Sequence, residues 1–403
     1  MSLVLTLPTT GGGLQRYTLR DAAPIATAPP GTRFNRIAYS AAHVVADPRA
    51  AIDPWLQCAV DWDATIAYRR HLWSLGLGVA EAMDTAQRGM GLDWPTSLEL
   101  IRRSLDAARD VPGARVASGC GTDHLDPAAV TSVDDVIRAY DAQMEAIEAL
   151  GGQLIVMASR ALAKVAKSPA DYERVYDRVL RQARQPVILH WLGDMFDPAL
   201  KGYWGHADAD AAMTTALAVI EANAAKVDGI KISLLDKDKE IAMRRRLPSI
   251  GGPDGQGVRM YTGDDFNYAE LIAGDGAGTA PNHRHSDALL GIFDAIAPAA
   301  NAALAALAAG DAARFHAILA PTVPLSRHIF AAPTRFYKTG VVFMAWLNGH
   351  QRHFTMVGGQ QSTRSLVHLA ELFRLADAAG LIERPELAAR RMTQLLALHG
   401  VDA

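Results

Sequence analysis

The sequence predicts an α/β fold, a (β/α)8 TIM barrel with an N-terminal β-hairpin and a C-terminal helical extension. Three observations indicate it: short apolar runs of strand length, amphipathic segments between them, and a purely helical pattern from about residue 294 onward. Strands that alternate with helices in this way form a parallel sheet. Because no Gly-rich dinucleotide fingerprint follows the first strand, the pattern favours a barrel over a doubly wound sheet.

The chain divides into three predicted parts. Residues 3–19 alternate around a Gly-rich turn, so residues 1–33 are expected to form a β-hairpin and a Pro-rich connector. The barrel is predicted over residues 34–300. Residues 301–403 carry Ala-rich apolar faces at helical spacing and are expected to form a C-terminal helical domain.

Eight segments are predicted to be the barrel strands. Seven of them are apolar runs, and the Gly-rich segment 276–282 is taken as the eighth. The seven runs span residues 35–41, 77–83, 114–120, 153–159, 186–192, 227–233 and 258–263. Helices are predicted between most of them, each opening at an Asp or Ser that can cap its first turn.

Composition limits the function classes. With 403 residues, half of them hydrophobic, the chain can bury a large core. A net charge of -3 gives no basic footprint, so nucleic acid and anionic membrane surfaces are excluded as partners. Cys58 and Cys120 are too few for a disulfide framework, which suits a reducing cytoplasm. No signal peptide or membrane-length apolar run is evident, so we expect a cytoplasmic protein.

Lys231 stands between two isoleucines in the predicted strand 227–233. In a (β/α)8 barrel the reactive groups lie at the C-terminal ends of the strands. Burial lowers the pKa of an amine, and a neutral amine can attack a carbonyl to form a Schiff base. The alternative is structural: Lys231 pairs with a buried carboxylate such as Asp228 or Asp236. Position alone leaves both interpretations open.

The stretch "VDGIKIS" resembles the Gly-Ile-Lys strand that carries the Schiff-base lysine in the dihydrodipicolinate synthase / N-acetylneuraminate lyase family of class I aldolases. "PVILHWLG" resembles the fifth strand of that family, and "VRMYTGDDFNYAELIAGDGAGTAP" its seventh strand and Gly-Asp-Asp turn. "DWDATIAYRRHLWSLGLGVAEAM" and "AALAALAAGDAARFHAILAP" resemble its first barrel helix with the second strand and its first C-terminal helices. The resemblance is collinear over residues 34–390. It implies an imine on Lys231, no metal or other cofactor, and homodimers or homotetramers.

The loop after the second strand departs from this family. A Gly-Thr-Thr-Gly-Glu loop holds the α-keto carboxylate there, whereas this chain has "DTAQRG". Thr85 keeps one hydroxyl, Ala86 takes the place of the second threonine, and Arg88 replaces the glutamate. We therefore expect a substrate other than pyruvate. Arg88 is a candidate clamp for a carboxylate or phosphate, or a surface arginine of a βα loop.

His190 stands where the family has a tyrosine that shuttles protons. Because the unperturbed pKa of histidine lies near neutrality, His190 is predicted to take over proton transfer. Asp194 follows it and is expected to orient His190 or to bind substrate hydroxyls. A structural role for His190 is the alternative.

Other strand ends supply further candidates. Ser159 and Arg160 end the fourth predicted strand and are expected to bind substrate. Glu81 and Asp84 flank the end of the second strand, where a carboxylate serves as a general base or as the counter-ion of the lysine. Ser233 shares the lysine's face of its strand, because residues two apart in a strand point the same way.

The predicted function is a class I aldolase, lyase or dehydratase that acts on a keto acid or keto sugar. His283 and His285 open a rival, a metal-dependent hydrolase or sugar epimerase, with His190 and nearby carboxylates as ligands. This pair is expected in the loop after the eighth strand. A third hypothesis is a non-catalytic binding barrel, motivated by the altered "DTAQRG" loop. Asp264 and Asp265 are interpreted as architectural, following the resemblance.

Overall fold

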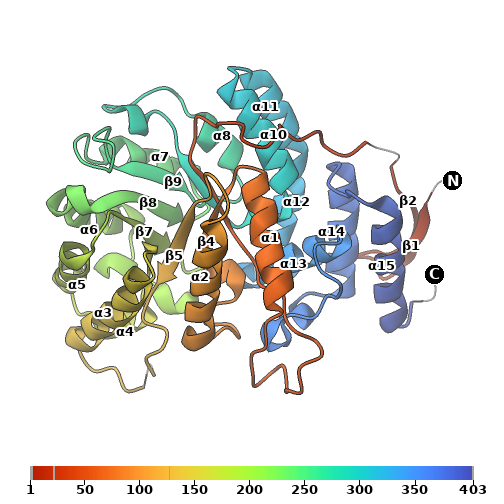
Figure 1. Cartoon of the computed structure of the whole chain (residues 1–403), viewed down its shortest axis with the longest axis horizontal. Coiled ribbons are helices and arrows are strands. Elements are labelled where there is room, and N and C mark those ends of the chain that lie inside the picture. Colours follow the sequence, from red (N-terminus) through yellow and green to blue (C-terminus); the bar gives the residue numbers. More distant parts are fainter. Residues whose placement is uncertain (1–2, 21–22, 127, 402–403) are drawn as a thin grey trace.

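Eight parallel strands close into a barrel in the computed structural model, which describes residues 3–20, 23–126 and 128–401 (Figure 1). Each strand pairs with the next along the chain, and the last pairs with the first. The predicted TIM barrel is thus confirmed. Its strands are β3 (Ala38–Ala41), β4 (Gly78–Glu81), β5 (Val116–Cys120), β6 (Gln153–Met157), β7 (Val187–Leu192), β8 (Val227–Ser233), β9 (Arg259–Thr262) and β10 (Asp287–Leu290).

Helices surround the barrel, and side-chain caps fix where several of them begin. Asp61 and Asp93 accept hydrogen bonds from backbone N–H groups of the first helical turns, and Ser132 opens a capping box. The helices of the barrel are α1 (Trp62–Ser74), α2 (Trp94–Ala108), α3 (Val133–Ala149), α4 (Arg160–Val165), α5 (Pro169–Gln182), α6 (Ala209–Ala222), α7 (Lys237–Arg246) and α8 (Tyr268–Ala273).

The strands separate two apolar layers. The larger layer fills the space between strands and helices. The smaller layer fills the inside of the barrel, where alternate residues of each strand point. Its buried members are Tyr39, Ala41, Ala80, Met83, Ala117, Ile155, Ile188, Tyr261 and Leu289.

Seven of the predicted strands are confirmed, and the eighth was placed wrongly. Segment 276–282 forms a loop and the start of the short 3-10 helix η5 (Pro281–His283), while β10 is the eighth strand. Gly276 has a φ of +70°, which a strand residue does not adopt. Asp287 opens β10, and its Oδ1 accepts a hydrogen bond from the Ile37 backbone N–H at 2.7 Å. The eighth strand was not recognised in the sequence because it has only four residues and begins with a carboxylate.

Helices after the barrel form the predicted C-terminal extension. Helix α13 is buried along its whole length and contacts the 3-10 turn η1 (Asp84–Ala86) that follows β4. The C-terminal region thus reaches the mouth of the barrel. Its helices are α9 (Ile292–Ala295), α10 (Ala297–Ala308), α11 (Ala312–Leu319), α12 (Val323–Ile329), α13 (Tyr337–Leu347), α14 (Leu366–Ala378) and α15 (Pro385–Leu398).

The predicted N-terminal hairpin is confirmed as the antiparallel pair β1 (Val4–Pro8) and β2 (Leu14–Thr18). It packs against α14 and α15, at the end of the molecule farthest from the barrel (Figure 1). The Tyr17 hydroxyl donates to Asp377 at 2.6 Å, and Arg374 donates to the Pro8 carbonyl at 2.9 Å. The hairpin therefore completes the C-terminal helical layer.

Within the described part of the chain, every helix is too short or too polar to span a lipid bilayer.

Candidate active site

Lys231 lies on the inner face of β8, near its C-terminal end. Gly229 lies two residues earlier in β8 and therefore faces the same side of the sheet. Because Gly229 has no side chain, the Tyr261 ring has room inside the barrel. In the sheet Lys231 stands beside His190 of β7 and Tyr261 of β9. The residue is 7% exposed, so the amine is held in the mouth of the barrel, largely out of water.

The environment of Lys231 shifts its amine toward the neutral form. Burial lowers its pKa, and the charges of Asp84 and Asp265 partly oppose that shift. Among the described residues, the two carboxylates act on the lysine as nearby charges and not as hydrogen-bonded partners. A charged amine is thus less stabilised here than in a closed ion pair.

Asp265 is the carboxylate of the Gly-Asp-Asp turn after β9. Burial raises its pKa to about 7, against the hydrogen bond from the Ile292 backbone N–H at 2.8 Å and the charge of Lys231. A carboxyl group with such a pKa can give or accept a proton near neutrality. The resemblance implies an architectural role for Asp265, and its charge also acts on Lys231.

Gly263 makes space for the lysine. A Cβ atom at this position would stand 2.8 Å from Lys231 Cε and would also collide with the Ser233 hydroxyl. Glycine here therefore allows Lys231 and Ser233 to occupy the inner face together.

His190 connects Lys231 with a cavity. It is buried, and its Nε2 lies 3.4 Å from Ser233 Oγ. Burial, followed by the charge of Lys231, holds the pKa of His190 well below its ordinary value of 6.5. The imidazole is therefore neutral at physiological pH, and its two nitrogens offer one donor and one acceptor.

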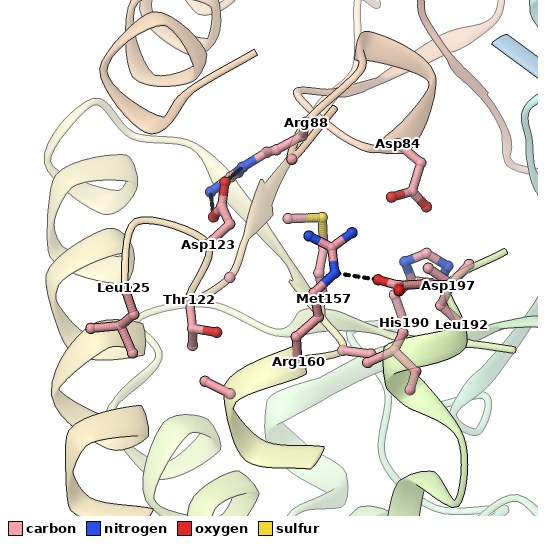
Figure 2. Close-up of a pocket in the computed structure, with 15 residues that line it drawn as sticks. Asp84, Arg88, Thr122, Asp123, Leu125, Met157, Arg160, His190, Leu192 and Asp197 are labelled. Atoms are coloured by element: carbon pink, nitrogen blue, oxygen red, sulfur yellow. Dashed lines mark hydrogen bonds and ion pairs between the residues drawn. The ribbon is translucent and has the colours of Figure 1, made fainter. Parts of the chain in front are cut away.

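A cavity of about 130 Å³ opens beside His190, at the C-terminal ends of β4 to β7. Charged, polar and apolar side chains line it together, as Figure 2 shows. Its lining includes Asp84, Arg88, Thr122, Asp123, Leu125, Met157, Arg160, His190, Leu192 and Asp197. Lys231 stands beside His190 on the neighbouring strand β8 and is not itself one of the residues that line this cavity.

Helix α13 brings two residues to the site that sequence reasoning missed. The Tyr337 hydroxyl lies 2.7 Å from Thr85 Oγ1, and its ring stacks on Phe330 with centroids 4.4 Å apart. Lys338 is buried, and its amine donates to the Arg335 carbonyl at 3.0 Å. Burial lowers the pKa of Lys338 to about 8, while the charge of Asp84 opposes this shift.

A family model described as "Protein of unknown function (DUF993)" matches residues 5–401. The chain belongs to this family. No curated protein matches it.

Solved structures of dihydrodipicolinate synthases share the fold. The protein from Aquifex aeolicus has 12% identity and a TM-score of 0.57, covering 91% of this chain and 98% of its own. The protein from Agrobacterium tumefaciens str. C58 has 14% identity and a TM-score of 0.57, covering 85% and 99%. YagE from E. coli K12, a prophage protein of the dihydrodipicolinic acid synthase family, has 13% identity and a TM-score of 0.59, covering 91% and 99%. The resemblance seen in the sequence is therefore confirmed at the level of the fold.

In the altered loop of this DUF993 member, Arg88 is engaged by hydrogen bonds to nearby residues of the chain. Arg88 donates to Asp123 through two nitrogens, at 2.9 and 2.7 Å, and a third bonds the Gly119 carbonyl. Its guanidinium also lies 4.9 Å from the Trp94 ring centroid. Arg88 lines the cavity with most of its donors engaged, so its role as a substrate clamp stays a prediction.

The end of β6 contributes one polar residue to the fold and one to the cavity. Ser159 caps α4, because its hydroxyl accepts from the Leu162 backbone N–H at 3.0 Å, and it also contacts the Thr122 hydroxyl. Arg160 lines the cavity and forms an ion pair with Asp197 through Nε.

Two predicted site residues lie away from the cavity. Glu81 has the outward parity of β4 and is paired with Arg69 at 2.8 Å, behind the strand. Asp194 is exposed, whereas Asp197, three residues further on, lines the cavity.

The histidine pair lies before the eighth strand, contrary to the expected position. His283 is in η5 and contacts Gly257, which precedes β9, so it belongs to the N-terminal end of the barrel. Among residues 3–20, 23–126 and 128–401, no three His, Cys, Asp or Glu side chains are grouped so as to hold a metal ion.

Proposed function

We propose that this DUF993 member is a Schiff-base lyase that acts on a small keto acid or keto sugar, with the imine on Lys231. One observation carries the proposal: a buried lysine with a lowered pKa at the C-terminal end of a barrel strand, next to a cavity. Only the neutral amine attacks a carbonyl carbon, so an environment that favours it prepares the nucleophile.

The comparisons support the type of chemistry and the local geometry argues for a different substrate. The structure of YagE was solved in complex with pyruvate, a small carbonyl compound. In this chain, the Thr85 side chain is hydrogen-bonded to Tyr337 and the Arg88 side chain to Asp123. The loop that follows β4 therefore presents a ligand with groups different from those of the Gly-Thr-Thr-Gly-Glu loop. We propose that the carbonyl compound bound here differs from pyruvate in the groups that surround its reacting carbon.

The reaction would begin when the Lys231 amine adds to the carbonyl carbon. The resulting carbinolamine loses water after its oxygen is protonated, and Asp265, with a pKa of about 7, is suited to donate that proton. In C–C cleavage, the protonated imine takes the electron pair of the bond between the α and β carbons, the β-hydroxyl loses its proton, and the β fragment leaves as an aldehyde or ketone. In dehydration, a base removes a proton from the α carbon. Both steps give an enamine, which takes up a proton at the α carbon in the first case and, in the second, expels the β-hydroxyl as water once that oxygen is protonated. Hydrolysis then returns the amine and releases a carbonyl product.

His190 and Ser233 would move protons at the reacting carbon. Neutral His190 accepts a proton from the substrate hydroxyl or carbon and passes it on through Ser233, whose hydroxyl lies 3.4 Å from Nε2. A neutral imidazole beside the imine adds no second positive charge to the buried site.

Borohydride trapping tests the proposal. The protein is incubated with pyruvate, 2-oxoglutarate or dihydroxyacetone, reduced, digested and examined by mass spectrometry. One reduced substrate is expected on the peptide that contains Lys231, and none in Lys231→Met. The exposed Lys237→Met is the matched control and should be trapped normally. An adduct on Lys338, or a stoichiometric metal ion that His190→Ala loses, would contradict the assignment.

A further inference from the structure

Two cationic side chains from distant parts of the chain lie at the cavity and behind it. Arg160 begins α4, and Lys338 lies in the first turn of α13. The charges of Asp84, Arg160 and Asp197 all act on Lys338, so these groups share one electrostatic environment. Three of the four line the cavity, and Lys338 lies buried behind them.

The guanidinium of Arg160 is only partly engaged. Its side chain is 44% exposed, and Nε forms an ion pair with Asp197. Among the described residues Asp197 is its one hydrogen-bonded partner, which leaves the two terminal nitrogens available. Figure 2 shows these nitrogens directed toward the side of the cavity where Arg88 and Asp84 lie.

Gly89 leaves room for this placement of Arg160. A Cβ atom at residue 89 would stand 2.9 Å from Arg160 Nη1. The φ of +71° at Gly89 is also one that other residues rarely adopt. With glycine at this position, the guanidinium can lie against the backbone of the loop after β4. Arg88 beside it has the opposite character, because Asp123 occupies two of its nitrogens.

We propose that Arg160 and Lys338 form a subsite for an anionic group of the carbonyl substrate, a phosphate or a second carboxylate. The free edge of a guanidinium binds two oxygens of such a group, and the ammonium of Lys338 adds a second positive charge. Asp197 is the internal anion that neutralises Arg160 while the subsite is empty. This inference rests on the proposed function, since it names the substrate class: phosphorylated keto sugars or dicarboxylic keto acids.

Binding of inorganic phosphate tests the subsite without any imine chemistry. Phosphate binding is measured by calorimetry on the wild-type protein and on Arg160→Gln. The variant should bind phosphate at least about tenfold more weakly than the wild type, because a charge-assisted hydrogen bond is lost. Lys338→Met should weaken binding as well. Arg174→Gln is the matched control, because Arg174 is an exposed arginine paired with an aspartate outside the cavity. It should bind phosphate as the wild type does.

Asp197→Asn should change the phosphate affinity in the opposite direction. If Asp197 competes with the ligand for Arg160, its neutral replacement should bind phosphate several-fold more tightly. If the Arg160–Asp197 pair serves only to close the fold, Asp197→Asn should bind no better than the wild type. That result, or equal phosphate affinity in wild type and Arg160→Gln, overturns the subsite.

Matched ketones connect the subsite with the imine. Trapping is compared for dihydroxyacetone and dihydroxyacetone phosphate, and for pentan-2-one and 4-oxopentanoate, which separates a phosphate from a carboxylate. In one of these pairs the anionic ketone should half-saturate Lys231 at a concentration about tenfold lower, and Arg160→Gln should remove the preference. Equal trapping of both members of each pair overturns the subsite and leaves the imine. Arg160-dependent phosphate binding without trapping of any ketone overturns the imine and leaves the subsite.

Discussion

The two ends of the barrel both bury charge, but they hold it differently. At the N-terminal end, Arg259 forms ion pairs with Asp228 at 3.6 Å and Asp287 at 3.2 Å. At the C-terminal end, Lys231 has Asp84 and Asp265 nearby as charges, without a hydrogen bond to either among the described residues. A cation that is closely paired stabilises a fold, whereas one that is buried and loosely balanced is available for chemistry.

The pKa shifts at the two ends run in opposite directions. Burial lowers the pKa of both cations. At Arg259 the charges of Asp287 and the other anions around it outweigh burial, and the pKa is raised. At Lys231 burial outweighs Asp84 and Asp265, and the pKa is lowered.

The largest expected effect is on activity at the C-terminal end. Lys231→Met should reduce turnover at least about a thousandfold, because the proposed nucleophile is lost. Its free energy of unfolding should stay within about 1 kcal/mol of the wild-type value or rise, since a loosely paired buried amine is replaced by an apolar side chain. Steady-state kinetics and urea unfolding measure the two quantities. A strongly destabilised Lys231→Met would place this lysine with Arg259, among the structural cations.

The next effect is on stability at the N-terminal end. Arg259→Met leaves Asp228 and Asp287 buried without their cation and should cost about 3–5 kcal/mol. Urea unfolding measures the loss. Arg245→Met, at an exposed arginine, is the control and should change stability by less than about 1 kcal/mol. A similarly small change in Arg259→Met would remove the distinction between the two ends.

A pH profile refines the comparison. The charge of Asp265 raises the pKa of Lys231, so Asp265→Asn should lower that pKa further. The neutral amine then persists to lower pH, and the acid limb of the kcat/KM profile should move down by up to about one pH unit. Asp228→Asn, at the other end, should leave that limb in place. An acid limb that stays in place or moves upward in Asp265→Asn would contradict the effect of Asp265 on the pKa of Lys231.

The smallest expected effect concerns Glu240, a buried carboxyl behind the barrel wall that bonds Thr262 and Ser286. Burial raises its pKa from 4.5 to about 8. The folded state therefore binds this proton more tightly than the unfolded chain. Stability from this group is complete below about pH 4.5 and is lost as the pH rises to about 8. Glu240→Gln should remove this dependence and flatten the stability profile in that window. An unchanged profile would contradict the raised pKa.

Much of the barrel could be predicted because its strands are apolar runs between polar, well-capped helices. The eighth strand escaped because β10 is short and opens with the charged residue Asp287. Its carboxylate is acceptable only because Arg259, distant in sequence, pairs with it. No local pattern reveals such a partner.

The site was predictable only where strand position fixes direction. Lys231 and His190 could be placed at the mouth from their strands, and parity explains why Glu81 points outward. Tyr337 and Lys338 could not be placed, because α13 is buried on all sides and shows no amphipathic period. The available signal was the run of three polar residues, Tyr337, Lys338 and Thr339, that opens an otherwise apolar helix.

The position of α13 also bears on the order in which the protein is made. The barrel strands leave the ribosome before Tyr337 and Lys338 are synthesised. Lys231 is thus present long before the residues that complete its surroundings, so a nascent barrel lacks part of its mouth. We expect a chain that ends before α13 to lack the Thr85–Tyr337 contact at this mouth.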